Sequence, residues 1–129
     1  MIPKYRAWHK TWEEMGNVKR IRFDDEGNVT TVFVMSKTSG SNAYLKDIEL
    51  MQSTGLKDKN GKEIFEGDIV DYKGRKAIVS WHGSYACFIY EFVDELKNRT
   101  TEWQPLYLSY YKFEIIGNSL ENPELLEVE

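Results

Sequence analysis

The stretch Met51–Tyr72, with the sequence MQSTGLKDKNGKEIFEGDIVDY, decides the fold because it contains three turn signals close together. Glycine adopts positive φ without steric cost, and asparagine tolerates the left-handed region better than most residues. The stretch ends in the apolar, β-prone run Ile69–Tyr72. We therefore predict a rigid, tightly turned junction that leads into a β-sheet, and its structural turn residues are Gly55, Asn60, Gly61, Gly67 and Asp68.

Working outward, short apolar runs separated by Gly, Asn and Asp predict a mainly β fold. The most distinct local pattern is a hairpin, in which the loop Asp24–Asn28 joins two strands and Gly27 takes the left-handed position. Pro105 lacks an N–H group, so its run belongs at a sheet edge. The predicted strands are 4–9, 18–23, 29–35, 62–65, 68–72, 76–81, 85–92, 103–108 and 113–116. In strand 76–81, Ala77, Val79 and Trp81 share one face.

Two segments are ambiguous from pattern alone. Trp8 and Trp12 lie four residues apart, which fits either a short helical turn or a second strand. Residues 36–42 form a polar loop, and residues 43–51 fit a short helix with Asn42 as N-cap. At the C-terminal end, Asn122 and Pro123 predict a capped helical turn.

Composition is that of a globular protein with a packed interior, since 41% of the 129 residues are hydrophobic and 14% are aromatic. No apolar run follows the N-terminus, and no window is long and apolar enough for a membrane helix. The single cysteine, Cys87, excludes an internal disulfide. We therefore expect a soluble cytoplasmic protein that does not associate with membranes.

The net charge of −4 is unevenly distributed. Residues 1–22 carry six Lys or Arg against two Glu, whereas residues 91–129 carry nine Asp or Glu against three Lys or Arg. The plainer interpretation is that both are solvated faces. The alternative is self-association between unlike ends, which makes a homo-oligomer a candidate state.

No constellation of catalytic or metal-binding residues is evident. Asp58 and Asn60 begin like a calcium loop, but Lys62 and Ile69 stand at positions that require oxygen ligands. A structural zinc site needs recognisable pairs of ligands, and the only candidates are His9, His82 and Cys87. Cys87 lies in an apolar run, where a thiol normally behaves as a small buried hydrophobe. We expect no catalytic residue, no metal and no cofactor.

Two binding surfaces are candidates. The first is a protein-binding surface in the aromatic run of residues 103–111, made of Trp103, Tyr107, Tyr110 and Tyr111. The second is a nucleic-acid site at Lys73, Arg75 and Lys76. The second is weaker, because acids interleave the cations and leave residues 57–76 at only +1.

Three blocks of the chain resemble the YopX family, small proteins of phages and prophages of Gram-positive bacteria. The central block includes Thr54-Gly55-Leu56, Asn60-Gly61 and Glu66-Gly67-Asp68-Ile69-Val70, and the outer blocks are Tyr5-Arg6-Ala7-Trp8, Ile116-Gly117-Asn118 and Glu121–Leu126. The resemblance favours extended backbone over residues 48–52. It implies an N-terminal β-hairpin subdomain (1–54), an SH3-like barrel portion (55–129), a place in the host cytoplasm and no established activity. The function expected is that of a non-enzymatic phage accessory protein that binds a host or phage protein. Nucleic-acid binding is the alternative.

Overall fold

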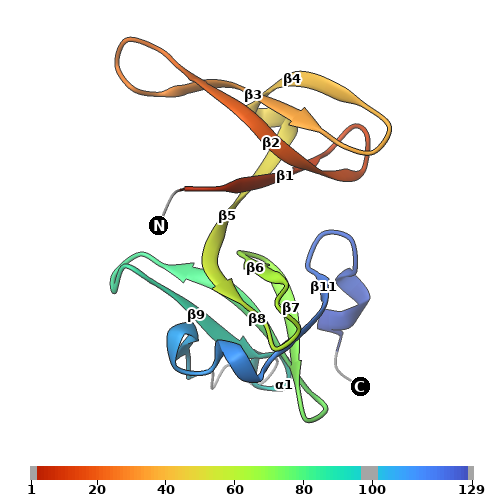
Figure 1. Ribbon diagram of the computed structural model, residues 1–129, viewed down its shortest axis with the longest axis vertical. Coiled ribbons are helices and arrows are strands. Elements are labelled where there is room, and N and C mark those ends of the chain that lie inside the picture. The colour runs from red at the N-terminus through yellow and green to blue at the C-terminus, as the bar shows by residue number, and fades with distance from the viewer. Residues whose placement is uncertain (1–2, 97–101, 128–129) are drawn as a thin grey trace. The chain divides into compact units, whose positions relative to one another are not determined.

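The computed structural model describes residues 3–96 and 102–127, and it consists mainly of antiparallel strands (Figure 1). The chain divides into two units, one ending at Gln52 and the other beginning at Ser53. The predicted boundary lies two residues later, between residues 54 and 55. Each unit has its own cluster of buried side chains.

The N-terminal unit is a meander of strands whose spatial order is β4-β3-β2-β1-β5. Its elements are β1 (Tyr5–His9), β2 (Glu14–Phe23), β3 (Val29–Met35), β4 (Gly40–Tyr44), the 3₁₀ turn η1 (Leu45–Asp47) and the first part of β5 (Ile48–Lys57). The core of the unit is small and aliphatic, and consists of Ala7, Val32, Val34, Ala43 and Ile48. The β2–β3 hairpin was predicted correctly, and Gly27 has φ +86°.

Residues 43–51, which fitted a short helix by pattern while the family resemblance favoured extended backbone over 48–52, do not form an α-helix, and residues 48–52 are extended. Residues 40–44 are strand β4, paired with β3, and β5 begins at Ile48 and pairs with β1. The spacing that suggested a helix comes from two residues on opposite faces of one strand: Ile48 and Met51 are three residues apart in β5, and both are buried. The predicted polar loop is correspondingly shorter, since β4 takes its last residues.

The ambiguous segment after β1 is a tight turn. The main-chain N–H of Trp12 donates to Nδ1 of His9 at 3.2 Å, and the two rings stack with centroids 3.9 Å apart. Glu13 completes the turn with φ +53°. The spacing of the tryptophans therefore reflects a turn that reverses the chain into β2.

The C-terminal unit is built on a five-stranded antiparallel sheet with the order β10-β9-β8-β7-β11. Its elements are β6 (Glu63–Phe65), β7 (Asp68–Tyr72), β8 (Arg75–His82), β9 (Cys87–Phe92), α1 (Val93–Leu96), β10 (Gln104–Pro105), η2 (Leu106–Leu108), η3 (Tyr110–Lys112), β11 (Glu114–Asn118) and η4 (Pro123–Leu126). Among the residues described, the edge strands β10 and β11 do not pair with each other. The mainly β class is confirmed, but the predicted SH3-like barrel is not, because the sheet does not close.

The core of this unit packs between the sheet and the 3₁₀ turns that follow it. Its buried residues are Ile64, Val70, Ala77, Val79, Tyr90, Leu106 and Phe113. The ring of Phe113 makes edge contacts with Tyr90 and Tyr72, with centroids 4.9 and 6.1 Å apart. Pro105 lies in the two-residue edge strand β10, as its missing N–H group predicted.

The deciding stretch contains two corners rather than three. Gly55, with φ +76°, lies inside β5, where the register with β6 shifts between Ser53 and Lys57. It marks a bulge and not the predicted chain reversal. Gly61 (φ +80°) and Gly67 (φ +85°) do form corners, on either side of β6.

The last turn, η4, has Pro123 at its start as predicted, but the predicted capping interaction is absent. Oδ1 of Asn122 instead accepts the main-chain N–H of Asn118 at 3.2 Å. Asn122 therefore holds the end of β11 close to η4. A Cβ added to Gly117 would lie 2.6 Å from the same oxygen, so this close approach requires glycine.

Candidate functional site

The most distinctive surface feature of the C-terminal unit is a set of aromatic rings on the β8–β9 hairpin and beside it, which we call the aromatic surface. It comprises two groups of rings in edge or tilted contact, Trp81 with Phe88 and His82 with Tyr85 and Trp103. The rings of His82, Tyr85 and Trp103 contact one another, with centroids 4.8 to 5.0 Å apart. Trp81 makes an edge contact with Phe88 at 5.0 Å.

The β8–β9 hairpin positions four of these rings. Trp81 pairs with Phe88 and His82 with Cys87 across the two strands, and residues between them form the turn. Ala86 has φ +50°, so the chain bends sharply before β9. Because the hairpin tip extends past the core, Tyr85 is 65% exposed and Trp81 is 46% exposed.

Trp81 and Tyr85 were not predicted as surface residues. The alternation of β8 placed Trp81 with Ala77 and Val79, which are fully buried, but the core ends before Trp81. Tyr85 was assigned to a strand that in fact begins at Cys87. The turn signal at Gly83 and Ser84 was the only indication in the sequence that these rings lie at a tip.

The four residues predicted as an interaction surface have different environments. Trp103 is half-buried within the aromatic surface. Tyr107 and Tyr111 are 59% and 56% exposed, and Lys112 Nζ lies 5.6 Å from the centre of the Tyr111 ring. Tyr110 packs against the core and also makes an edge contact with Tyr111.

His82 and Cys87 lie directly opposite each other in the hairpin. Cys87 is half-buried, and Nδ1 of His82 is buried without a hydrogen-bond partner among the residues that the structure describes. Within the described ranges, no group of three or more His, Cys, Asp or Glu side chains is placed to hold a metal ion.

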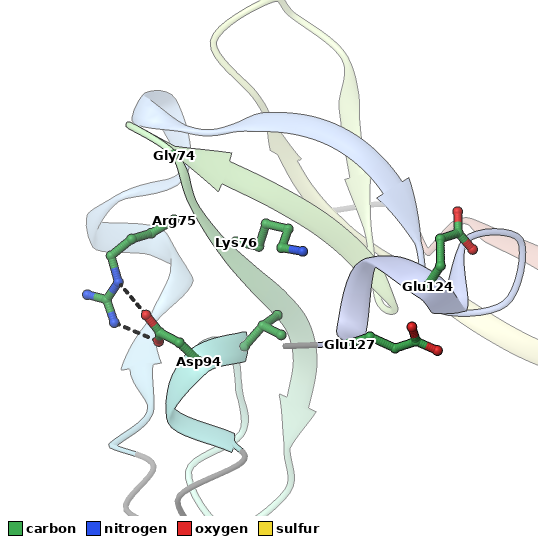
Figure 2. A pocket seen from close by; sticks show the side chains of 7 residues that line it. Gly74, Arg75, Lys76, Asp94, Glu124 and Glu127 are labelled. Carbon is green, nitrogen blue, oxygen red and sulfur yellow. Dashed lines mark hydrogen bonds and ion pairs between the residues drawn. The ribbon is translucent and has the colours of Figure 1, made fainter. Parts of the chain in front are cut away.

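Two of the three residues predicted to contact nucleic acid, Arg75 and Lys76, border a pocket of about 390 Å³ (Figure 2). Arg75 donates to both carboxylate oxygens of Asp94, at 3.2 and 2.9 Å, and to Glu95 at 3.3 Å. These hydrogen bonds lower the pKa of Asp94 and raise that of Arg75. The guanidinium also lies 3.6 Å from the centre of the Phe92 ring.

Carboxylates outnumber cations around this pocket. Figure 2 shows Lys76 between the Arg75–Asp94 pair on one side and Glu124 and Glu127 on the other. Two cations and three carboxylates thus belong to the residues that line this pocket. Lys73 lies in the β7–β8 turn with φ +50°, and its Nζ is 5.4 Å from the centre of the Tyr72 ring.

The predicted turn residues organise the main chain around two buried carboxylates. Asp58 accepts hydrogen bonds from the N–H groups of Asn60 and Lys62 on one oxygen and of Ile115 on the other. Asp68, which is 2% exposed, accepts the N–H of Phe65 at 2.8 Å across the Gly67 turn.

None of the described helices is long and apolar enough to cross a membrane. Among curated proteins, none matches the chain. The chain is similar to a solved structure, the crystal structure of protein EF1440 from Enterococcus faecalis, with a TM-score of 0.66 and 33% identity. The match covers 98% of this chain and 99% of that one. The family model described as YopX protein matches residues 4–127, which is nearly the whole length, so the chain belongs to the YopX family.

Proposed function

We propose that this protein is a non-enzymatic accessory protein that binds another protein through its aromatic surface. The observation that carries the proposal is the cluster of rings at the β8–β9 tip, where Tyr85 and Trp81 are exposed although they are held in place by ring contacts. Trp and Tyr are enriched at the energetic centres of protein interfaces. Exposed apolar area of this kind marks interaction sites on soluble proteins.

Ring contacts lower the cost of binding. Trp103 packs on both His82 and Tyr85, so the ring of Tyr85 loses less freedom when a partner covers it. Tyr107, Leu108 and Tyr111 add further exposed apolar area in the same unit. When a partner covers these side chains, the burial of their apolar surface contributes about 25 cal/mol of favourable free energy per Å².

We further propose a phage or prophage origin and action in the host cytoplasm, as the resemblance to the YopX family implies. An SH3-like arrangement of the C-terminal unit is supported by its chain order. Strands β7 to β10 follow one another across the sheet, two 3₁₀ turns come next, and β11 returns beside β7. Self-association between the basic and acidic ends is a further proposal, which sedimentation at low and high salt tests.

Nucleic-acid binding at Lys73, Arg75 and Lys76 is the second candidate. It is weaker because Arg75 is already paired with Asp94 and Glu95, and because Glu124 and Glu127 border the same pocket. Phosphate binding requires several net cations on one face.

The deciding experiment compares affinity-tagged chains expressed in the host. The triple variant Tyr85→Ala, Tyr107→Ala, Tyr111→Ala is set against Tyr44→Ala, which removes a tyrosine of similar exposure (62%) from the other unit. We expect the wild type and Tyr44→Ala to retain a stoichiometric protein partner at moderate salt, and the triple variant to lose it. Recovery of no partner by the wild type contradicts the proposal. Gel shifts with DNA and RNA at low salt test the second candidate.

A further inference from the structure

We propose that the open edge of β2, over residues 19–23, binds an extended acidic segment of a partner polypeptide as an added β-strand. This site is in the N-terminal unit and does not depend on the aromatic surface. Three features support it: an edge of unpaired main chain, an apolar groove beside that edge, and a basic border.

The edge exists because β1 is shorter than β2. Pairing between the two strands ends at Arg6 and Asn17, and beyond that point β2 pairs only with β3 on its other side. A register shift between Val18 and Arg20 marks a bulge where β2 leaves β1. Figure 1 shows the β2–β3 hairpin diverging from β1. In the described part of the chain, no strand covers this edge, so alternate N–H and C=O groups of residues 19–23 face outward.

A groove of about 530 Å³ runs along this edge. Its apolar lining comes from four strands and includes Tyr5, Val18, Ile21, Phe23, Val29 and Leu50. Phe23 is a large apolar side chain at the end of this strand, and it is 60% exposed. An added strand places every second side chain on one face, so its apolar residues can enter the groove while the main chain pairs with β2.

The positive charges on β2 favour an acidic segment as the added strand. Lys19 and Arg20 line the groove and Arg22 is exposed on the same strand. Pairing with the same edge of a second copy would bring these cations opposite one another, which is destabilising. An acidic segment instead places carboxylates beside them.

A further consideration favours a polypeptide over a nucleic acid. A phosphodiester chain cannot pair with main-chain N–H and C=O groups as a strand does.

The test uses the full chain and a fluorescein-labelled peptide of alternating glutamate and valine, with binding followed by fluorescence anisotropy. We expect saturable binding that weakens at least about tenfold in Lys19→Glu, Arg20→Glu. The control, Lys37→Glu, Lys46→Glu, makes the same change of charge outside the groove in the same unit and should bind as the wild type does.

N-methylated probes identify the binding mode without altering the protein. A peptide methylated on every valine nitrogen and one methylated on every glutamate nitrogen block opposite edges of the strand. Strand addition predicts that one of them loses binding at least about tenfold while the other keeps it. Amide hydrogens in residues 19–23 should also gain protection from exchange when the unmodified peptide binds.

The inference is overturned if both methylated peptides bind equally, if Lys19→Glu, Arg20→Glu binds as the wild type does, or if no saturable binding occurs below about 1 mM. Tighter binding of a single-stranded oligonucleotide of equal charge would also overturn it. Because all these variants lie outside the aromatic surface, failure here leaves the proposed function untouched.

Discussion

Oδ2 of Asp58 accepts a hydrogen bond from the main-chain N–H of Ile115 at 3.0 Å, although 57 residues separate them in the sequence. The other carboxylate oxygen accepts the N–H groups of Asn60 and Lys62 at 2.9 and 2.8 Å. A main-chain hydrogen bond from Lys59 N–H to the carbonyl of Phe113 lies beside them. A buried carboxylate thus joins the turn before β6 to the strand β11 that returns to the sheet.

Replacing Asp58 by Asn should destabilise the protein substantially. Asn retains one acceptor oxygen, but its amide nitrogen is a donor and cannot accept the second set of N–H groups. Because Asp58 is only 6% exposed, water cannot replace the lost acceptor. We expect the free energy of unfolding to fall by about 1.5–3 kcal/mol, measured by urea unfolding near neutral pH.

Asp24 provides the matched control, because its Oδ1 accepts the N–H groups of Glu26 and Asn28 in a similar turn. Asp24 is exposed, so water can satisfy the turn in Asp24→Asn. We expect Asp24→Asn to lower the free energy of unfolding by less than Asp58→Asn does. Equal losses in the two variants would show that burial and the contact to Ile115 contribute nothing.

Acid should remove the contribution of Asp58. Burial raises the pKa of this carboxyl, but hydrogen bonds from Ile115, Lys62 and Asn60 lower it by more, so the pKa lies below its ordinary value of 3.8. A carboxyl with a depressed pKa in the folded state contributes stability above its unfolded pKa, and loses that contribution as pH falls through the folded pKa. We therefore expect the difference in unfolding free energy between the wild type and Asp58→Asn to be full near neutral pH and to shrink below about pH 4. A difference that stays constant down to about pH 2 would contradict this assignment.

Much of the fold follows from local pattern. Strand β7 and strand β3 were predicted with the bounds that the structure has, since turn residues flank each of them directly. Residues 40–51 could not be assigned from pattern, because residues 45–47 form a 3₁₀ turn between two strands and the spacing of Ile48 and Met51 also fits a helix. The segment is extended because β4 pairs with β3 and β5 pairs with β1. Those partners are distant in sequence, so the pairing leaves no pattern within the segment itself.

The candidate sites were less predictable than the fold. Exposure of Trp81 depends on where the core ends under β8, and alternation within the strand carries no information about that. The groove beside β2 depends on the difference in length between β1 and β2, which is set by pairing. The pairing of Arg75 with Asp94 likewise joins residues 19 apart that only the sheet and α1 bring together.

Gly16 should be intolerant of a side chain for a reason that the sequence does not reveal. It is buried in β2, and an added Cβ would lie 2.6 Å from Cγ1 of Val34 and 3.0 Å from the carbonyl oxygen of Met35. We expect Gly16→Ala to lower the free energy of unfolding by about 1–3 kcal/mol, as other overpacked sites do. Gly40→Ala in the same sheet is the control, because its Cβ would meet nothing closer than 3.4 Å. Similar stability of the two variants would show that Val34 and the β3 main chain can shift to accommodate the added Cβ without a loss of unfolding free energy.

Trp103 should contribute to stability, whereas Tyr107, which lies in η2, should not. The Trp103 ring contacts His82 at 4.8 Å and Tyr85 at 5.0 Å, so Trp103→Ala removes two ring contacts and uncovers the hairpin tip. Because an aromatic pair contributes about 0.5–1.5 kcal/mol beyond the area that it buries, we expect a loss of about 1–2 kcal/mol in unfolding free energy. Tyr107 is 59% exposed, and Tyr107→Ala should change stability by less than about 0.5 kcal/mol. Trp103→Phe keeps an aromatic ring and should recover part of the loss. If Trp103→Ala and Tyr107→Ala were equally stable, the rings at the hairpin tip would not be held by Trp103, and the aromatic surface would lack the preorganisation on which its proposed binding role depends.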